Sequence, residues 1–182
     1  RMNIFSPLIS AGTISLLFLI CNQFIDRLNS SDNMKYFKMW SSVIASLTFA
    51  FTHSHWFNAV ETEVYALSSF MTALVVYLIL IWSKNKEKEY STMYLMGIVY
   101  VIGLATGVHL LNLLTIPFIG LIIYFSTSNF STKNLIITLG LSLLAFIVIQ
   151  NGIIKGFPII VDKIGFEGLL LFIGILAYLL YS

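Results

Sequence analysis

Cysteine and charged side chains are both scarce in this chain. Its 182 residues contain a single cysteine, Cys21, within an apolar run, which excludes a disulfide framework and a thiolate metal centre. Charged residues make up 10% of the sequence and hydrophobic residues 58%, whereas soluble domains are about 25% charged. The net charge of +2 is small and scattered, which argues against a nucleic-acid partner. The composition therefore predicts a polytopic integral membrane protein.

Seven apolar segments predict an all-α bundle of about seven transmembrane helices, because a backbone in hydrocarbon must satisfy its own hydrogen bonds. They are approximately Ile4–Phe24, Phe37–Phe51, Ala59–Trp82, Met93–Gly107, Leu110–Phe125, Leu135–Ile149 and Gly168–Tyr181. The first segment is too long for the apolar region of a signal peptide. Because the chain opens with Arg1 and ends inside an apolar run, we expect residues 1–182 to be one partial transmembrane domain, truncated at both ends.

The stretch from Ser91 to Ser126 is too long to cross a membrane as one helix. At about 1.5 Å per residue it would extend roughly 54 Å, against a hydrocarbon core of about 30 Å. We expect it to bend back at Gly103–Asn112, where two glycines precede the polar residues His109 and Asn112. The spacing of Gly103 and Gly107 is equally typical of a helix-packing face.

Basic residues are divided unequally between the two ends of the predicted bundle. One side receives Arg27, Lys35, Lys38, Lys84, Lys86, Lys88 and Lys133, and the other Arg1, Lys155 and Lys163. The positive-inside rule then predicts that the lysine-rich connectors are cytoplasmic. Three polar features from distant parts of the chain would meet on the exterior face: Thr52–Phe57, the Gly107–Asn112 turn and Asn151–Phe166.

Two carboxylates, Glu61 and Glu63, stand where the third apolar segment begins. Ionisable residues at such a position are costly unless they face a partner, a cavity or a ligand. Asn58 and Glu61 fit a helix-capping arrangement, which gives Glu61 a structural alternative. Glu63 cannot share this cap, because residues two apart on a helix lie on nearly opposite faces. If the backbone is extended, both carboxylates point the same way and are candidates for binding a cation or a substrate.

Histidines and aromatic residues surround these carboxylates. His53 and His55 alternate in a predicted short loop, but two histidines without a third ligand are a weak metal signal. We therefore predict no metal site and interpret both as interfacial polar residues. Trp56, Phe57 and Tyr65 suit the aromatic belt at a membrane surface, and stacking against a sugar ring is the functional alternative.

His109 and Asn112 lie at the exterior end of the expected bend, and their spacing places them on one face if the segment is helical. His109 is either a donor to a phosphate group or a partner in an interhelical hydrogen bond. The candidate substrate-binding residues are therefore Trp56, Glu61, Glu63, Tyr65, His109 and Asn112.

The run Trp56–Leu67, WFNAVETEVYAL, resembles the W-x-x-A-V-E-x-E-V-Y-A-L signature of the plexin-type protein O-mannosyltransferase family, which has bacterial members. The stretch Gly103–Pro117, GLATGVHLLNLLTIP, is similar to that family's glycine-flanked H-x-x-N-L followed by proline. The opening Arg1–Ser6, RMNIFS, resembles the R-x-N-L-x-S start of its second membrane helix. These landmarks occur in the family's order and cover most of the chain.

The resemblance implies a GT-C membrane glycosyltransferase, expected in a bacterial inner membrane. Such an enzyme transfers a mannose-like sugar from a polyprenyl-phosphate carrier to a protein hydroxyl at the exterior face. Its partners would be membrane lipid, the lipid-linked sugar and a protein acceptor, with no certain cofactor and with metal dependence left open.

The family's catalytic acidic residue is expected in a first exterior loop that would precede Arg1, after a first membrane helix that the chain lacks. The chain alone is then expected to be inactive. Glu61 and Glu63 match the acidic pair of the second exterior loop, whereas His53 and His55 depart from the family. The alternative function is a transporter or flippase-like module whose exterior polar residues form a gate. No internal repeat is visible, which counts against that alternative.

Overall fold

The structure, a computed structural model, describes residues 4–28, 35–61 and 64–181. Every regular element in these ranges is helical, which confirms the predicted all-α architecture. The elements are α1 (Phe5–Leu28), α2 (Lys35–Ala50), α3 (His53–Val60), α4 (Tyr65–Asn85), α5 (Ser91–Val108), the 3-10 helix η2 (Leu110–Leu114), α6 (Thr115–Thr127), α7 (Thr132–Val148), the π-helix η3 (Ile149–Gly156) and α8 (Phe157–Tyr181).

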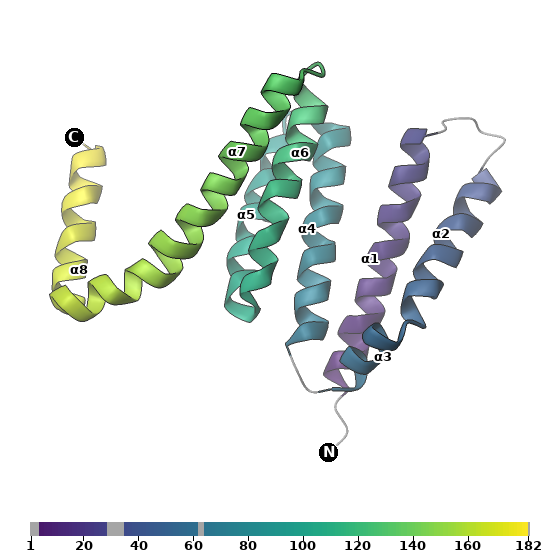
Figure 1. Ribbon diagram of the computed structural model, residues 1–182, viewed down its shortest axis with the longest axis horizontal. Helices are drawn as coiled ribbons and strands as arrows, with labels where there is room; N and C mark the ends of the chain where they lie inside the picture. Colours follow the sequence, from purple (N-terminus) through teal and green to yellow (C-terminus); the bar gives the residue numbers. More distant parts are fainter. Residues whose placement is uncertain (1–3, 29–34, 62–63, 182) are drawn as a thin grey trace.

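The long helices run up and down between two ends of the molecule (Figure 1). We name the end that carries α3, the start of α4 and η2 the α3 end, and the end where α1 and α4 finish the Lys84 end. The predicted bend between Ser91 and Ser126 is confirmed, because α5 stops at Val108 and α6 returns after η2.

Within the described residues, five helical stretches are long and apolar enough to cross a membrane. They are Phe5–Arg27, Tyr65–Asn85, Ser91–Val108, Leu110–Thr127 and Thr132–Gly165. About seven membrane helices were expected, and five helices in the described residues meet the length and hydropathy of a full span. α2 is not among them, because it has only 16 residues and a full span needs about twenty. The third segment also begins later than predicted, since α4 starts at Tyr65 while Ala59 belongs to α3.

α4 is the central helix, in contact with α1, α5 and α6. The buried core between α4 and α5 consists of Val75, Ile79, Trp82, Ile98 and Val101, with Phe118 and Ile122 of α6 packed against it. The apolar α4 thus contacts protein on several sides. Its first turns are consequently held in a fixed position relative to α5 and η2.

Small polar residues are buried in both α1 and α2, two helices that contact each other. Ser6, Ser10 and Thr13 of α1 and Ser42 and Ser46 of α2 are all buried. Small side chains allow membrane helices to approach closely, and that approach supplies the packing energy that hydrophobic burial cannot supply in lipid. The α1–α4 contact is close as well, because a Cβ atom at Gly12 would lie 2.9 Å from the ring of Phe70.

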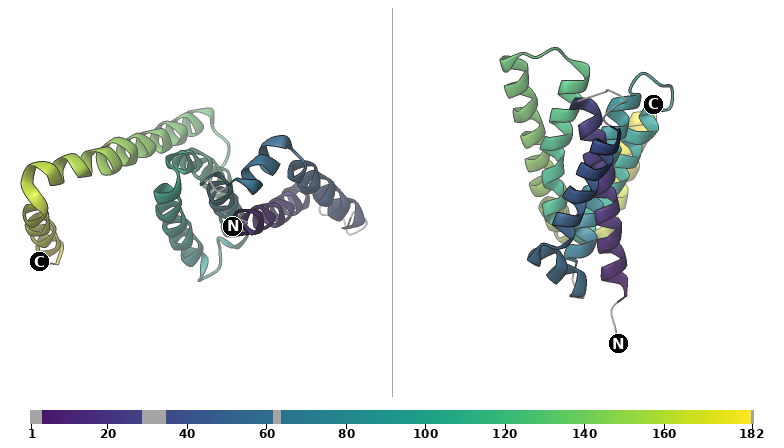
Figure 2. Two further views of the ribbon diagram at one scale, coloured as in Figure 1. Left: turned by 90° about the horizontal axis from the view of Figure 1, so that it is seen from below. Right: turned by 90° about the vertical axis from the view of Figure 1, so that its right-hand side faces the viewer.

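The chain leaves this bundle after α7, so that η3 and α8 lie apart from it. α7 packs on α6 and η3, has no buried residue, and leads through η3 into α8, which turns back at Gly165 (Figures 1 and 2). Gly165 has φ 71°, a left-handed conformation that glycine adopts without a steric penalty. Figure 1 and the left-hand view of Figure 2 place the predicted surface segment Asn151–Phe166 well apart from α3, although it lies toward the same end of the molecule, so it does not contact the other two polar features.

Candidate functional site

The predicted loop at Thr52–Phe57 is instead the start of the short helix α3. Thr52 is its N-cap, and the Thr52 Oγ1 accepts a hydrogen bond from the His55 N–H at 3.4 Å. α3 ends at Glu61, whose backbone N–H donates to the Phe57 carbonyl at 3.1 Å. The predicted cap by Asn58 and Glu61 is therefore wrong. The threonine hydroxyl satisfies a first-turn amide earlier in the chain, and Asn58 becomes a residue within the helix.

The acidic pair follows α3 directly. Glu61 is half-buried and has an extended backbone, φ −78° and ψ 146°. This is the conformation that the hypothesis of two parallel carboxylates requires at its first member. Glu63 lies outside the described residues, so the parallel arrangement stays a prediction.

The two histidines of α3 point in different directions, because residues two apart on a helix do not share a face. His53 is exposed and stacks on Phe57 with ring centroids 6.1 Å apart. His55 is only 8% exposed and packs against Phe49, with ring centroids 4.8 Å apart. Burial lowers the pKa of His55, and a smaller opposing effect comes from a hydrogen bond to the backbone of Ser10. The interpretation of His53 as an interfacial polar residue stays a prediction, whereas His55 is a packed residue.

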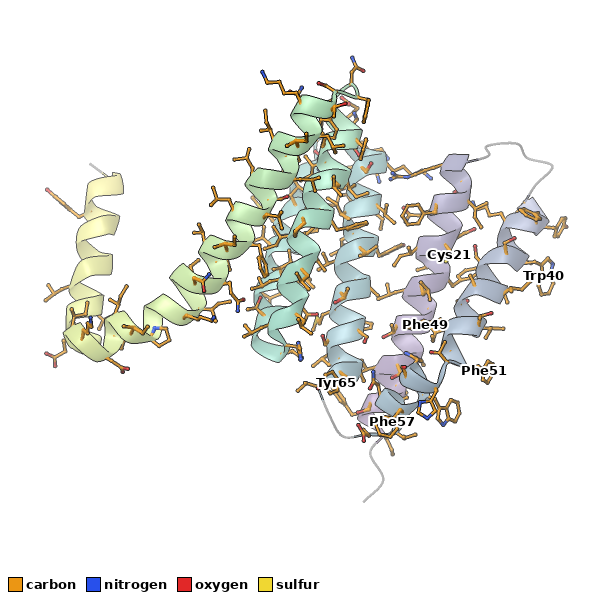
Figure 3. The ribbon with its side chains drawn as sticks, viewed as in Figure 1. Cys21, Trp40, Phe49, Phe51, Phe57 and Tyr65 are labelled. Carbon is orange, nitrogen blue, oxygen red and sulfur yellow. The ribbon has the colours of Figure 1, made fainter. Side chains whose placement is uncertain are left out.

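Aromatic rings gather at the α3 end, where Figure 3 shows Phe57 and Tyr65. Trp56 is 60% exposed and Tyr65 is 44% exposed. The Tyr65 ring lies against the imidazole of His109, with centroids 5.6 Å apart and planes tilted by 45°. Two candidate residues that are 44 positions apart in the sequence therefore meet, one at the start of α4 and the other in the bend after α5.

His109 is held in one orientation by its own turn. Its backbone is extended, with φ −155° and ψ 126°, and its Nδ1 accepts the N–H of Leu111 at 3.2 Å. In the neutral imidazole the proton then resides on Nε2, because the ring nitrogen that accepts a hydrogen bond cannot carry it. The half-buried His109 thus presents an N–H donor from a turn at the α3 end.

Asn112 has a different environment from His109. It is 3% exposed, and its Oδ1 accepts hydrogen bonds from Ser68 at 2.9 Å and Thr72 at 2.8 Å. Its Nδ2 donates to the carbonyl of Ala105 at 2.8 Å. Asn112 therefore ties η2 to both α4 and α5, and whether it also contacts a substrate stays a prediction.

The sequence reasoning missed Ser68 and Thr72. Both are hydroxyl residues in an otherwise apolar helix, and their spacing of four puts them on one helical face. That pattern is the signal that would have indicated a polar partner for α4. The identity of the partner depends on how α4 packs against η2, which no local pattern records.

A metal centre finds no support among the described residues, since no three His, Cys, Asp or Glu residues in that part of the chain are grouped closely enough to hold an ion. Glu63 lies outside the described residues. The chemistry that these residues do offer is hydrogen bonding by His109, aromatic stacking by Trp56 and Tyr65, and a carboxylate at Glu61.

A family match covers this region. The family described as protein O-mannosyl-transferase TMEM260 N-terminal domain matches residues 1–132, a range that includes α1 to α6 and every candidate site residue. No curated protein and no solved structure matches the chain.

Proposed function

Because the chain belongs to the family of protein O-mannosyl-transferase TMEM260 N-terminal domains, we propose that it moves a mannose-like sugar from a polyprenyl-phosphate carrier to a protein hydroxyl. We further propose a GT-C architecture and transfer at the exterior membrane face. Family membership supports sugar transfer in general and favours it over the transporter alternative. The observation that carries the site is the contact between Tyr65 and His109 at the α3 end.

The reaction needs two kinds of help. The acceptor oxygen must lose a proton as it bonds to the anomeric carbon, and the bond from that carbon to the phosphate oxygen must break. Negative charge then develops on the departing phosphate, which a fixed donor stabilises more in the transition state than in the ground state. The proposal gives this second role to the Nε2–H of His109. It assigns the general base to no residue described here.

The remaining candidates would orient the substrates. Trp56 and Tyr65 are exposed aromatic residues, and their faces suit the apolar side of a sugar ring. The carboxylates of Glu61 and Glu63 would accept hydrogen bonds from sugar or acceptor hydroxyls, which fixes the reacting atoms relative to each other. Asn112 acts indirectly in this scheme, because it is buried and holds the turn that carries His109.

The test is a transfer assay on the full-length protein with radiolabelled polyprenyl-phosphate mannose and membrane acceptors. Glu63→Gln should lower kcat roughly 100-fold, since loss of orientation alone has an effect of that order. His109→Ala should lower kcat by about the same factor, as removal of a single oxyanion donor does. His109→Gln should retain more activity than His109→Ala, because its amide N–H lies near the position of the Nε2–H.

Two matched controls separate these effects from general damage. His53→Gln removes an exposed histidine of the same end, and Glu87→Gln removes an exposed carboxylate between α4 and α5; both should transfer sugar at the parent rate. Unchanged activity in Glu63→Gln would remove Glu63 from the site. Equal activity in the alanine and glutamine variants of His109 would refute the donor role.

A further inference from the structure

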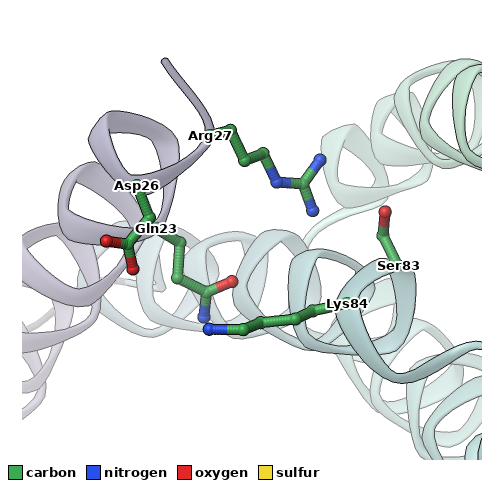
Figure 4. A pocket seen from close by; sticks show the side chains of 5 residues that line it. All are labelled: Gln23, Asp26, Arg27, Ser83 and Lys84. Atoms are coloured by element: carbon green, nitrogen blue, oxygen red, sulfur yellow. The ribbon is translucent and has the colours of Figure 1, made fainter. Parts of the chain in front are cut away.

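A cavity lies at the Lys84 end, away from the candidate site. It has a volume of about 530 Å³ and opens between α1 and α4, lined by Gln23, Asp26, Arg27, Ser83 and Lys84 (Figure 4). The size falls within the range of small-ligand sites, about 300–1,000 Å³. Each of the described side chains that line it is polar or charged, which distinguishes it from the mainly apolar grooves between α6 and α7 and between α1 and α2.

The charge of this cavity is positive. Asp26 forms an ion pair with Lys38 of α2, so its carboxylate is balanced from outside the lining. Arg27 and Lys84 then contribute two further positive charges. The Arg27 Nη2 donates to the carbonyl of Leu80 at 3.2 Å, which holds the guanidinium across the space between α1 and α4. A guanidinium has five N–H donors, and the bond to Leu80 uses one of them, so a ligand could take others.

Helix termini reduce this positive charge but do not cancel it. α1 ends at Leu28 and α4 at Asn85, and each C-terminus carries about −0.5 of an elementary charge. Two full cations therefore exceed the combined effect of the termini, which is about −1. Basic residues in a last turn often serve only to complement the helix dipole. That explanation accounts for the positions of Arg27 and Lys84 in the last turns of α1 and α4, but it does not account for a polar cavity between them.

The position of the cavity favours one class of ligand. It lies where two candidate membrane spans end, Phe5–Arg27 and Tyr65–Asn85, and lipid headgroups occupy that level of a bilayer. Basic pockets between membrane helices are known to take phosphate-bearing headgroups. We propose that the cavity binds a phosphate-bearing anion, with Arg27 and Lys84 donating to its oxygens and Gln23 lining the same space.

The experiment measures ligand-induced thermal stabilisation of the full-length protein in a neutral detergent. A protein that binds a ligand only when folded melts at a higher temperature as the ligand is added. Phosphatidylglycerol, phosphatidylcholine, glycerol phosphate and inorganic phosphate are titrated separately, so a lipid source and a soluble source of the phosphate are distinguished. Lys84→Gln should weaken the apparent affinity roughly tenfold, the loss expected for one charged hydrogen bond.

Lys133→Gln is the matched control, because it removes the same charge from an exposed lysine in the first turn of α7. It should bind as the parent does. Stabilisation by phosphatidylglycerol alone that depends on Lys84 supports a lipid ligand, and the same dependence with glycerol phosphate or inorganic phosphate supports a soluble one. The proposal is overturned if no phosphate compound stabilises the protein through Lys84, or if Lys133→Gln weakens binding as much as Lys84→Gln.

Discussion

Replacing Asn112 with leucine should destabilise the folded protein by about 2 kcal/mol. Leucine keeps the branching of the side chain at Cγ, and the change removes three hydrogen bonds, to Ser68, Thr72 and Ala105. Interhelical hydrogen bonds in membrane proteins contribute about 0.6 kcal/mol each on average, so the loss of three such bonds amounts to about 2 kcal/mol. The value stays modest because serine and threonine hydroxyls in a helix can bond to the carbonyl one turn earlier instead.

A double-mutant cycle isolates the contact between Asn112 and α4. The variants are Asn112→Leu, the pair Ser68→Ala with Thr72→Ala, and all three changes together. Two hydroxyl bonds predict a coupling energy of about 1.2 kcal/mol. The free energy of unfolding is measured for the full-length protein in mixed micelles with SDS as the denaturant.

A near-zero coupling energy would contradict this prediction. A coupling energy within about 0.5 kcal/mol of zero is what independent sites show, and it would refute the idea that Asn112 holds α4 to η2. Asn134→Leu is the matched control, since Asn134 is exposed at the start of α7. It should change the free energy of unfolding by less than about 0.5 kcal/mol.

Two further predictions concern packing on α1. Burial lowers the pKa of His55 below the usual histidine value of about 6.5. The stability that the neutral, buried imidazole contributes is therefore present above about pH 6.5 and is lost as the pH falls through the lowered pKa. Thermal melts between about pH 5 and pH 7.5 should therefore lose part of their acid dependence in His55→Gln but not in His53→Gln, and an equal change in both would contradict this. Gly12→Leu should destabilise the protein by about 1–3 kcal/mol, because its Cβ would lie 2.9 Å from the Phe70 ring. Gly97→Leu, where a Cβ would meet nothing within 4 Å, should be close to neutral in the same denaturation assay.

The sequence was sufficient for the helices and for the bend. An apolar run in hydrocarbon has one stable backbone conformation, the helix, so the composition predicts both that these segments are regular and that they are helical. The bend followed from length, since Ser91–Ser126 exceeds the thickness of a bilayer as one helix. The glycines and polar residues then indicated where the chain turns, and η2 lies within that stretch.

The local structure around the acidic pair was harder to predict. Thr52 and Asn58 are both good N-cap residues, and the sequence offers no energetic reason to prefer one. The fold makes the choice through tertiary packing, because a helix that begins after Thr52 places His55 against Phe49. With Asn58 as the cap, the residues from His53 to Phe57 would have remained a loop, as predicted.

The hydrogen bonds of Asn112 could not be predicted from any local sequence pattern. Its hydroxyl partners lie 44 and 40 residues away in the sequence, on a helix whose rotation is set by the apolar contacts of Val75 and Ile79. The single-sequence reasoning therefore treated Asn112 and His109 as equivalent members of one face. The extended backbone at His109 separates them instead, since it turns the imidazole toward Tyr65 while Asn112 enters the interior.

This separation predicts different behaviour from two residues of the same motif. Asn112 has its oxygen and one amide N–H engaged by protein groups, so its replacement acts first on stability and reaches catalysis only through displacement of the turn. His109 has one ring nitrogen engaged by its own turn and carries its proton on the other, so its replacement acts on transfer without loosening α4 from α5. Replacing His109 should change kcat without changing the free energy of unfolding. Replacing Asn112 should change the free energy of unfolding first. These two results together would show that the turn combines a ligand-facing residue with the residue that positions it.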